Sequence, residues 1–345
     1  MTIRPVDPLL PTTVIGSWSV PDWLERAKTG VHHGTVSRSQ LADMHDMAVK
    51  AALKDQEVAG IDIVSDGELR RENDVDYLLS RFPGVEAANP AKAFYFDYLD
   101  LRLTRPLPDP GPEPLGLVPD LLFTKAHTDR PVRFSMTGPF SLSRRLRCDC
   151  YADRADLVRA IARVLNAEAA ALADAGAELL QIDEPLLAGH PEEVALAVEA
   201  VNMVTKDVPV TWALHVCYGN RYARPLWEGH YDFLFPAVLD AAVDQLLLEF
   251  ARKGDEDLGL VERHQWDRVL GVGVLDVKTA DVEPVEVVER RIERALDVLP
   301  PERILVTPDC GLRHVPADAA RAKLRAMTTA AAAVRGRLQK EKKDT

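Results

Sequence analysis

The sequence predicts an α/β protein with the (β/α)8 TIM barrel architecture, and two observations carry this prediction. Eight short apolar runs recur along the chain, and segments with helical periodicity follow most of them. Near-continuous apolar strands that alternate with helices are typical of a parallel sheet covered on both faces. Eight such units favour a barrel, which typically needs about 250 residues plus insertions. A doubly wound open sheet is the alternative fold.

The eight expected strands are apolar runs bounded by turn residues. We place them at residues 12–17, 61–68, 132–139, 178–185, 210–216, 245–250, 269–276 and 304–311. Three long helical patterns between them have recognisable ends. Gly60 and Gly176 stand at expected helix C-caps, and Pro284 suits a first helical turn.

The length and composition indicate a single globular domain that spans residues 1–345. Hydrophobic residues make up 47% of the chain and charged residues 28%, which is enough for a substantial core. Residues 84–131 are rich in proline and aromatic residues and fit neither the strand pattern nor the helix pattern. We therefore expect an excursion, such as a β-hairpin, between the second and third strand–helix units. Residues 340–345 are expected to be a solvated tail.

Charge and cysteine content exclude several classes of function. A net charge of -12 disfavours a nucleic-acid partner, because phosphate binding needs a basic face. No apolar run is long enough for a membrane span, and the N-terminus lacks the pattern of a secretory signal. Four cysteines in so long a chain do not form a disulfide framework, so we expect a cytoplasmic protein.

Ionisable residues follow several of the expected strands, at the end of a barrel where active sites lie. His215 and Cys217 are two positions apart, so on a strand they project from the same face. Glu249 and Cys310 end two later strands. Sulfur together with imidazole favours zinc over magnesium or calcium. The alternative is an ordinary buried imidazole beside small hydrophobic thiols.

The other two thiols, Cys148 and Cys150, are separated by a single residue. A second metal site and two ordinary loop thiols both fit this spacing, and the second interpretation is favoured.

Several motifs in the same order resemble the catalytic C-terminal barrel of the cobalamin-independent methionine synthase family. The resemblance extends from about Thr12 to the helix after Cys310. It rests on the segments "TTVIGS", "DGELRRENDVDYL", "MTGP", "QIDEP", "HVCY", "GVGVLDV" and "PDCGLR". One such motif alone would be weak, whereas seven in register are specific.

This resemblance implies zinc as the cofactor, homocysteine or a similar thiol as the substrate, and a role for each matching residue. The implied zinc ligands are His215, Cys217, Glu249 and Cys310. The implied contacts to the homocysteine backbone are Ile15, Gly16 and Ser17, and the carboxylates implied to face its ammonium group are Glu68 and Asp183. A buried ammonium group needs such negative charge. A thiol bound to zinc is deprotonated, so the nucleophile is a thiolate at neutral pH.

The chain departs from the family pattern in three respects. Full-length members carry a second barrel ahead of this one, which we do not expect here. The segment "MTGPFSLSRRLRCD" lacks the tryptophan that packs on the pterin of folate. The family has a histidine, proposed to protonate the leaving group, at a position where this chain has lysine in the run Asp276-Val277-Lys278. Asp276 and Lys278 are therefore the catalytic candidates. Lys278 would act as the acid if burial lowers its pKa.

These departures leave the methyl donor open between methyl-folate and a methyl-corrinoid. Expelling the folate nitrogen needs a positioned acid, whereas reduced cobalt leaves without one. A corrinoid or accessory protein could deliver the methyl group. The segment 219–236 could grip an anionic thiol or donor through Arg221, Arg224, Trp227 and His230, or it could be a surface loop.

The sequence therefore predicts a zinc-dependent thiol methyltransferase, with homocysteine as the expected substrate and methionine as the expected product. A zinc-dependent alkyltransferase or lyase that acts on another small thiol is the alternative enzyme. A non-catalytic, metal-stabilised binding protein is the alternative outside enzymes.

Overall fold

The structure, a computed structural model, describes residues 9–344 apart from 90–91 and 113. It is an α/β fold with a six-stranded parallel sheet in the order β3-β5-β6-β7-β8-β9 and a small sheet in the order β1-β2-β4. The strands are β1 Val85–Ala87, β2 Leu101–Leu103, β3 Arg133–Thr137, β4 Leu146–Cys148, β5 Leu179–Asp183, β6 Thr211–Val216, β7 Gln245–Leu248, β8 Val269–Leu275 and β9 Ile304–Pro308.

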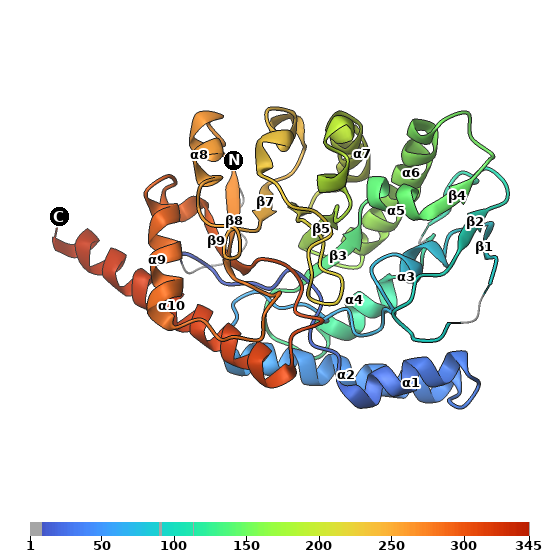
Figure 1. Cartoon of the computed structure of the whole chain (residues 1–345), viewed down its shortest axis with the longest axis horizontal. Helices are drawn as coiled ribbons and strands as arrows, with labels where there is room; N and C mark the ends of the chain where they lie inside the picture. Colours follow the sequence, from blue (N-terminus) through green and yellow to red (C-terminus); the bar gives the residue numbers. More distant parts are fainter. Residues whose placement is uncertain (1–8, 90–91, 113, 345) are drawn as a thin grey trace.

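Helices flank the parallel strands on both sides. They are α1 Asp22–His32, α2 Arg38–Ala59, α3 Asp76–Leu79, α4 Val118–Lys125, α5 Pro139–Arg145, α6 Arg154–Asp174, α7 Val194–Thr205, α8 Leu258–Arg263, α9 Val285–Leu296 and α10 Ala317–Asp344. Figure 1 shows α6, α7 and α8 along one side of the strands and α2 and α10 along the other. The strands between them are buried along almost their whole length, as a parallel sheet covered on both faces requires.

Six of the eight expected strands form the parallel sheet, but the first two do not form strands. Residues 12–17 and 61–68 contribute only single parallel bridges, namely Thr12–Val306, Thr13–Ile63 and Val64–Val132. In the first run the carbonyls of two residues accept hydrogen bonds from side chains instead of from a neighbouring strand. The Ile15 carbonyl accepts from Gln181 Nε2 and the Gly16 carbonyl from Ser65 Oγ, both at 2.6 Å.

The second run is broken by left-handed backbone. Gly67 has φ +68° and Glu68 has φ +54°, a region that extended strands do not use. The predicted strand 61–68 is therefore wrong, since only Ile63 and Val64 form single bridges. This turn directs the Glu68 side chain towards the interior of the protein.

The helix ends follow the sequence signals closely. Ser37 caps α2 in a capping box with Gln40, and Gly60 ends the helix with φ +88°, the conformation that favours glycine at this position. Helix α6 ends slightly before Gly176, since Ala175 is its C-cap. Pro284 is the N-cap of α9, one position before the first helical turn.

Residues 84–131 contain β1, β2 and α4. Strand β1 pairs antiparallel with β2, and β2 pairs in parallel with β4, so that Leu103 lies opposite Cys148. The buried Glu168 carboxylate of α6 accepts the backbone N–H groups of Leu115 and Leu117, each at 2.6 Å. These bonds fix the end of the segment to the main body.

The C-terminal helix α10 packs against α2 and α9. Residues 340 and 341 are exposed in this helix, and the rest of the predicted tail 340–345 lies outside the residues whose side chains are described. Across the described part of the chain, no helix combines the length and the apolarity that crossing a membrane requires.

Candidate metal centre and substrate pocket

The structure brings together three of the four predicted metal ligands. His215 lies near the end of β6 and Cys217 just after it, while Cys310 follows β9. One nitrogen and two sulfur atoms from these side chains lie within 4.8 Å of one another. The two Sγ atoms are 3.7 Å apart. An imidazole and two thiols are a donor set that can hold a metal ion.

The orientation of His215 fits a metal ligand. Its Nδ1 lies 3.2 Å from the Leu247 carbonyl oxygen, to which the N–H donates. Its Nε2 is buried and has no hydrogen-bond partner among the described residues. Metal-binding histidines commonly use one ring nitrogen for such an orienting bond and the other for the metal.

The two thiols differ in acidity. Contact with the Cys217 thiol and the nearby charge of the His215 imidazole outweigh burial and hold the pKa of Cys310 well below its usual range. The same contact with Cys310, together with burial, raises the pKa of Cys217. The pair therefore shares one proton readily, and a cation placed between the sulfurs would stabilise the thiolate form of both.

Glu249 follows β7 and is not part of this three-residue group. Its Oε1 lies 2.7 Å from Lys278 Nζ, and its Oε2 is buried without a partner among the described residues. Burial raises the pKa of Glu249 to about 7 although Lys278 opposes the shift. The carboxylate is thus engaged with a lysine and retains one free oxygen.

Lys278 does not have the lowered pKa that the sequence analysis required of an acid. Burial lowers its pKa, but the negative charges of Glu249, Cys310 and Cys217 outweigh burial, so the pKa of Lys278 is raised. Asp276 Oδ1 accepts the backbone N–H of Lys278 at 2.8 Å. In this structure Asp276 therefore holds the turn that carries Lys278.

A cavity of about 100 Å³ lies beside the three-residue group. Four predicted substrate contacts line it, namely Ile15, Ser17, Glu68 and Asp183. Gly16 lies behind them, and a Cβ atom at this position would be 2.3 Å from Glu68 Oε1. Only glycine leaves room there for the carboxylate.

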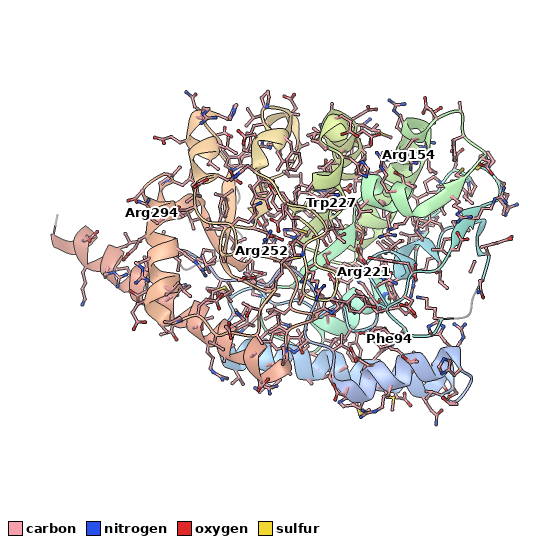
Figure 2. The ribbon with its side chains drawn as sticks, in the orientation of Figure 1. Phe94, Arg154, Arg221, Trp227, Arg252 and Arg294 are labelled. Atoms are coloured by element: carbon pink, nitrogen blue, oxygen red, sulfur yellow. The ribbon has the colours of Figure 1, made fainter. Side chains whose placement is uncertain are left out.

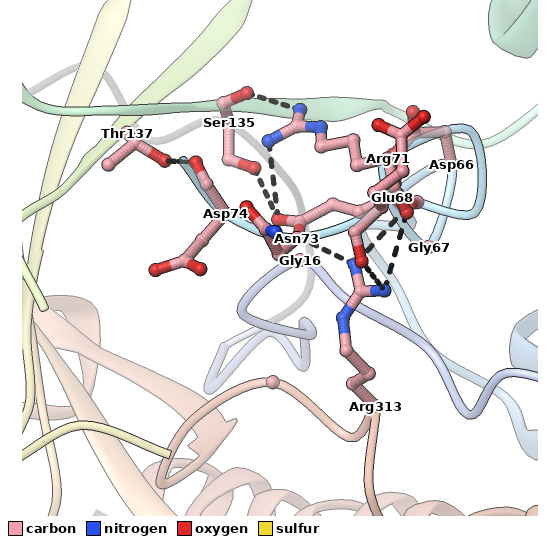
Figure 3. Close-up of polar contacts among 12 residues, drawn as sticks. Gly16, Asp66, Gly67, Glu68, Arg71, Asn73, Asp74, Ser135, Thr137 and Arg313 are labelled. Atoms are coloured by element: carbon pink, nitrogen blue, oxygen red, sulfur yellow. Dashed lines mark hydrogen bonds and ion pairs between the residues drawn. The ribbon is translucent and has the colours of Figure 1, made fainter. Parts of the chain in front are cut away.

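Glu68 is the centre of a polar network that the sequence did not predict (Figure 3). Its Oε1 accepts from Ser135 Oγ at 2.8 Å and lies 3.6 Å from Arg71 Nη1. Its Oε2 lies 3.7 Å from Arg313 Nη2. Both arginines are buried, and they compensate the charge of a carboxylate that is itself mostly buried.

Asp183 ends β5, the strand paired with β3, and lines the same cavity. Gln181 Nε2 donates to its Oδ1 at 2.6 Å, the same nitrogen that bonds the Ile15 carbonyl. Burial and the nearby charge of Glu68 raise the pKa of Asp183 to about 7. A buried carboxylate with a raised pKa gains from a cationic partner, such as an ammonium group.

Sequence reasoning also missed Asp74, Phe96 and Tyr98, which line the same cavity. Phe96 and Tyr98 come from the segment 84–131, whose loop geometry has no periodic signal. Asp74 lies within the motif "DGELRRENDVDYL" that also contains Glu68, and this shared motif was the available hint.

The four candidate residues in the segment 219–236 have different surroundings in the structure. Arg221 lines the cavity, whereas His230 is directed to Asp257 Oδ1 at 3.0 Å. Trp227 lies against Gly189, where an added Cβ would collide with its ring. Arg224 forms an antiparallel backbone bridge with Arg221 and does not line the cavity.

Cys148 and Cys150 are free thiols whose sulfur atoms lie 2.8 Å apart. Within the described residues, no third histidine, cysteine or carboxylate joins them in a possible metal-binding group.

Comparison with known proteins identifies relatives that match nearly the whole chain. The family model described as the catalytic domain of cobalamin-independent synthase matches residues 10–333. A methionine synthase of Sulfurisphaera tokodaii is 34% identical over 341 residues, which cover 96% of this chain and 94% of that protein. A methionine synthase of Saccharolobus solfataricus is 33% identical over 345 residues, with 97% of each chain covered.

A solved structure of similar fold is a B12-independent methionine synthase from Shewanella sp. W3-18-1 in complex with selenomethionine. It superposes with a TM-score of 0.84 and 26% identity, and the match covers 96% of this chain and 99% of that one. The match of sequence and fold over nearly the whole chain shows that the protein belongs to the cobalamin-independent methionine synthase family, through its catalytic domain.

Proposed function

We propose that the protein is a zinc-dependent methyltransferase that transfers a methyl group to the thiol of homocysteine and forms methionine. The observation that carries the proposal is the position of the soft donor group, His215, Cys217 and Cys310, in the wall of a cavity that also contains Glu68 and Asp183. A thiol and an ammonium group of one small amino acid can be accommodated together in such a cavity. The similarity to a protein solved with selenomethionine supports this assignment.

In this proposal the chain holds zinc through His215, Cys217 and Cys310, with the free oxygen of Glu249 as the fourth donor. A bound zinc ion supplies the positive charge that keeps a substrate thiol deprotonated at neutral pH. A carboxylate would be the most readily exchanged of these four donors, so Glu249 is the residue that would give way to a substrate sulfur.

The remaining residues bind and orient the amino acid. Asp183 and Glu68 face its ammonium group, while the backbone of Ile15, Gly16 and Ser17 receives its carboxylate end. Holding the sulfur at a fixed position converts methyl transfer into an effectively unimolecular step, which is a large part of the rate enhancement. In the free protein the charges of Glu249, Cys310 and Cys217 raise the pKa of Lys278 and hold its proton. Zinc bound by these three residues would offset those charges, so Lys278 is the candidate proton source for a leaving group that needs one.

We also infer that the sheet closes into a (β/α)8 barrel. The single bridges at Thr12–Val306, Thr13–Ile63 and Val64–Val132 support closure, because together they connect the β9 edge of the parallel sheet to its β3 edge. A closed barrel would gather the carboxyl ends of all strands around one site.

The proposal is tested by measuring methionine formed from homocysteine with zinc-loaded protein. Two donors are compared, methyl-folate (mono- and polyglutamate) and methyl-cobalamin, each with a reaction that lacks protein as background. We expect methionine above background with one of them. Zinc content, measured by mass spectrometry, is expected to be one ion per chain.

Two matched cysteine variants distinguish loss of the metal centre from the general effect of removing a thiol. Cys310→Ser is expected to lose zinc and methionine formation, whereas Cys148→Ser is expected to retain both. Equal zinc content and equal turnover in the two variants would contradict the assigned metal centre. Zinc-loaded protein that binds no homocysteine would contradict the proposed substrate.

A further inference from the structure

A second cavity, of about 800 Å³, lies between β2, β4, α5 and the start of α6. We call it the arginine cavity, after the five arginines that line it, Arg102, Arg144, Arg145, Arg147 and Arg154. This concentration of positive charge contrasts with the net charge of -12 of the whole chain. The volume is in the range of small-molecule sites.

Three of these arginines have carboxylate partners. The pairs are Arg144–Glu193, Arg147–Asp100 at 2.9 Å and Arg102–Asp149 at 2.7 Å. Charge in this part of the cavity is compensated by the chain itself.

The other two arginines have no carboxylate within ion-pair distance among the residues that the structure describes. Arg154 Nη1 donates to the Ser143 carbonyl at 2.8 Å, and Arg145 lies over the ring of Tyr98. Burial and the charge of Arg154 lower the pKa of Arg144. Burial is the larger cause of this shift, and the charge of Arg154 adds to it. The two arginines without a carboxylate partner are what make the cavity suited to an anion.

Tyr98 forms the wall between the arginine cavity and the cavity at the metal centre, since it lines both. The guanidinium carbons of Arg145 and Arg221 lie 4.2 Å and 4.3 Å from the centre of its ring. The Tyr98 hydroxyl donates to Asp74 Oδ1 at 2.8 Å, which fixes the ring. In Figure 2, Arg154 lies on the side of α6 and β4, and Arg221 lies nearer the middle of the molecule. Positively charged side chains thus extend from the metal centre, past Tyr98, to the arginine cavity.

We propose that the arginine cavity binds the polyanionic end of a small molecule whose other end reaches over Tyr98 to the metal centre. Arg145 and Arg154 are the two uncompensated cations, so the ligand carries at least two negative groups, either carboxylates or phosphates. Guanidinium groups bind both through paired, charge-assisted hydrogen bonds. The identity of this molecule as the methyl donor rests on the proposed function; the anion site itself does not.

The experiment is calorimetric titration of the full-length zinc-loaded protein with two anions, tripolyphosphate and propane-1,2,3-tricarboxylate. At least one is expected to bind with a stoichiometry of one per chain, and the tighter of the two identifies the preferred anionic group. The double variant Arg145→Gln/Arg154→Gln is expected to weaken binding by tenfold or more, because each lost charge-assisted contact costs about that factor. Arg294→Gln, in an exposed arginine of α9, is the matched control and is expected to bind like the wild type.

Absence of one-to-one binding by both anions would overturn the proposal, as would wild-type affinity in the double variant. Circular dichroism verifies that each variant is folded, and the single variant Arg154→Gln, in an exposed side chain, serves if the double variant is not. Homocysteine binding is titrated separately, without any anion. If homocysteine fails to bind while the anion binds, the proposed function fails and the arginine cavity stands.

Discussion

Lys278 is the residue whose role depends most on the methyl donor. Lys278→Ala is expected to slow methyl transfer from methyl-folate by about a hundredfold or more, because a positioned acid contributes roughly that factor. Transfer from methyl-cobalamin, which needs no proton, is expected to change much less. The measurement is the kcat with each donor under saturating homocysteine.

The control for this prediction is Lys278→Arg, which keeps a positive charge beside Glu249. It is expected to retain zinc and to lose only the folate reaction. If Lys278→Ala slows both donors to the same degree, Lys278 acts through Glu249 rather than as an acid.

His45 in α2 is a half-buried imidazole that makes the protein sensitive to acid. Burial, with the charges of Lys28 and Arg70, lowers the pKa of His45 to about 3, and its Nε2 has no partner among the described residues. The unfolded chain binds this proton near pH 6.5 while the folded protein does not, so stability is lost as the pH falls from about 6.5 towards 3.

His45→Gln is expected to remove this contribution. When the pH falls from 7 to 5, the free energy of unfolding decreases in both proteins. The decrease is expected to be about 1–2 kcal/mol smaller in the variant than in the wild type. Urea unfolding at both pH values measures the difference. His33→Gln removes an exposed imidazole as the control, and parallel pH profiles for wild type and His45→Gln would contradict the prediction.

The residues of the candidate site fall into two groups by how well sequence could find them. His215, Cys217 and Cys310 were predictable because a strand fixes where its last residues point and parallel strands end at one edge. Arg71 and Arg313 were not, because both reach Glu68 from loops. Arg71 follows the left-handed turn at Gly67 and Glu68, and Arg313 comes from the loop after β9. Periodicity carries no information about such a path.

At the scale of elements, two glycines of the helical layer make a matched pair. Gly60 ends α2 in the left-handed region, while Gly336 lies within α10 with open space around its Cβ position. Gly60→Ala is expected to destabilise the protein by about 1 kcal/mol, since alanine adopts this backbone at a cost. Gly336→Ala is expected to stabilise it by about 0.5–1 kcal/mol, because alanine favours the helix.

Thermal unfolding of the two variants beside the wild type measures both effects, and the signs are the test. Changes of the same sign would show that side-chain contacts, rather than backbone conformation, dominate at one of the positions.

Most elements could be predicted from sequence because their ends carry chemical signals. The Ser37 capping box and Gly60 bound α2 in sequence and in structure alike. The first two expected strands show the limit of this approach. Residues 12–17 are apolar enough for a strand, but their carbonyls bond to the side chains of Gln181 and Ser65, which are distant in sequence.

At the scale of the whole molecule, removal of the metal distinguishes two hypotheses, namely that the protein is an enzyme and that it is a metal-stabilised binding protein. The core is continuous without the metal centre, and Lys278 neutralises Glu249 in the absence of an ion. Chelator-treated protein is therefore expected to keep its circular dichroism spectrum and to unfold at a lower temperature, because a ligand that binds only the folded state stabilises it. Homocysteine binding, measured by calorimetry, is expected to disappear and to return with zinc.

Unfolding on chelation would contradict this expectation and would make the metal a structural element. Retention of homocysteine binding without metal would contradict the proposed role of the metal in holding the thiol.

The pairing of β2 with β4 joins two stretches of chain on either side of β3 into one small sheet. The segment 84–131 is therefore not a detachable module, since its removal would leave β4 without its neighbour and Tyr98 absent from the wall that two cavities share. Natural or laboratory evolution towards another methyl donor would have to alter both stretches together. Among relatives, lengths and charges of these two stretches are accordingly expected to change in concert rather than one at a time.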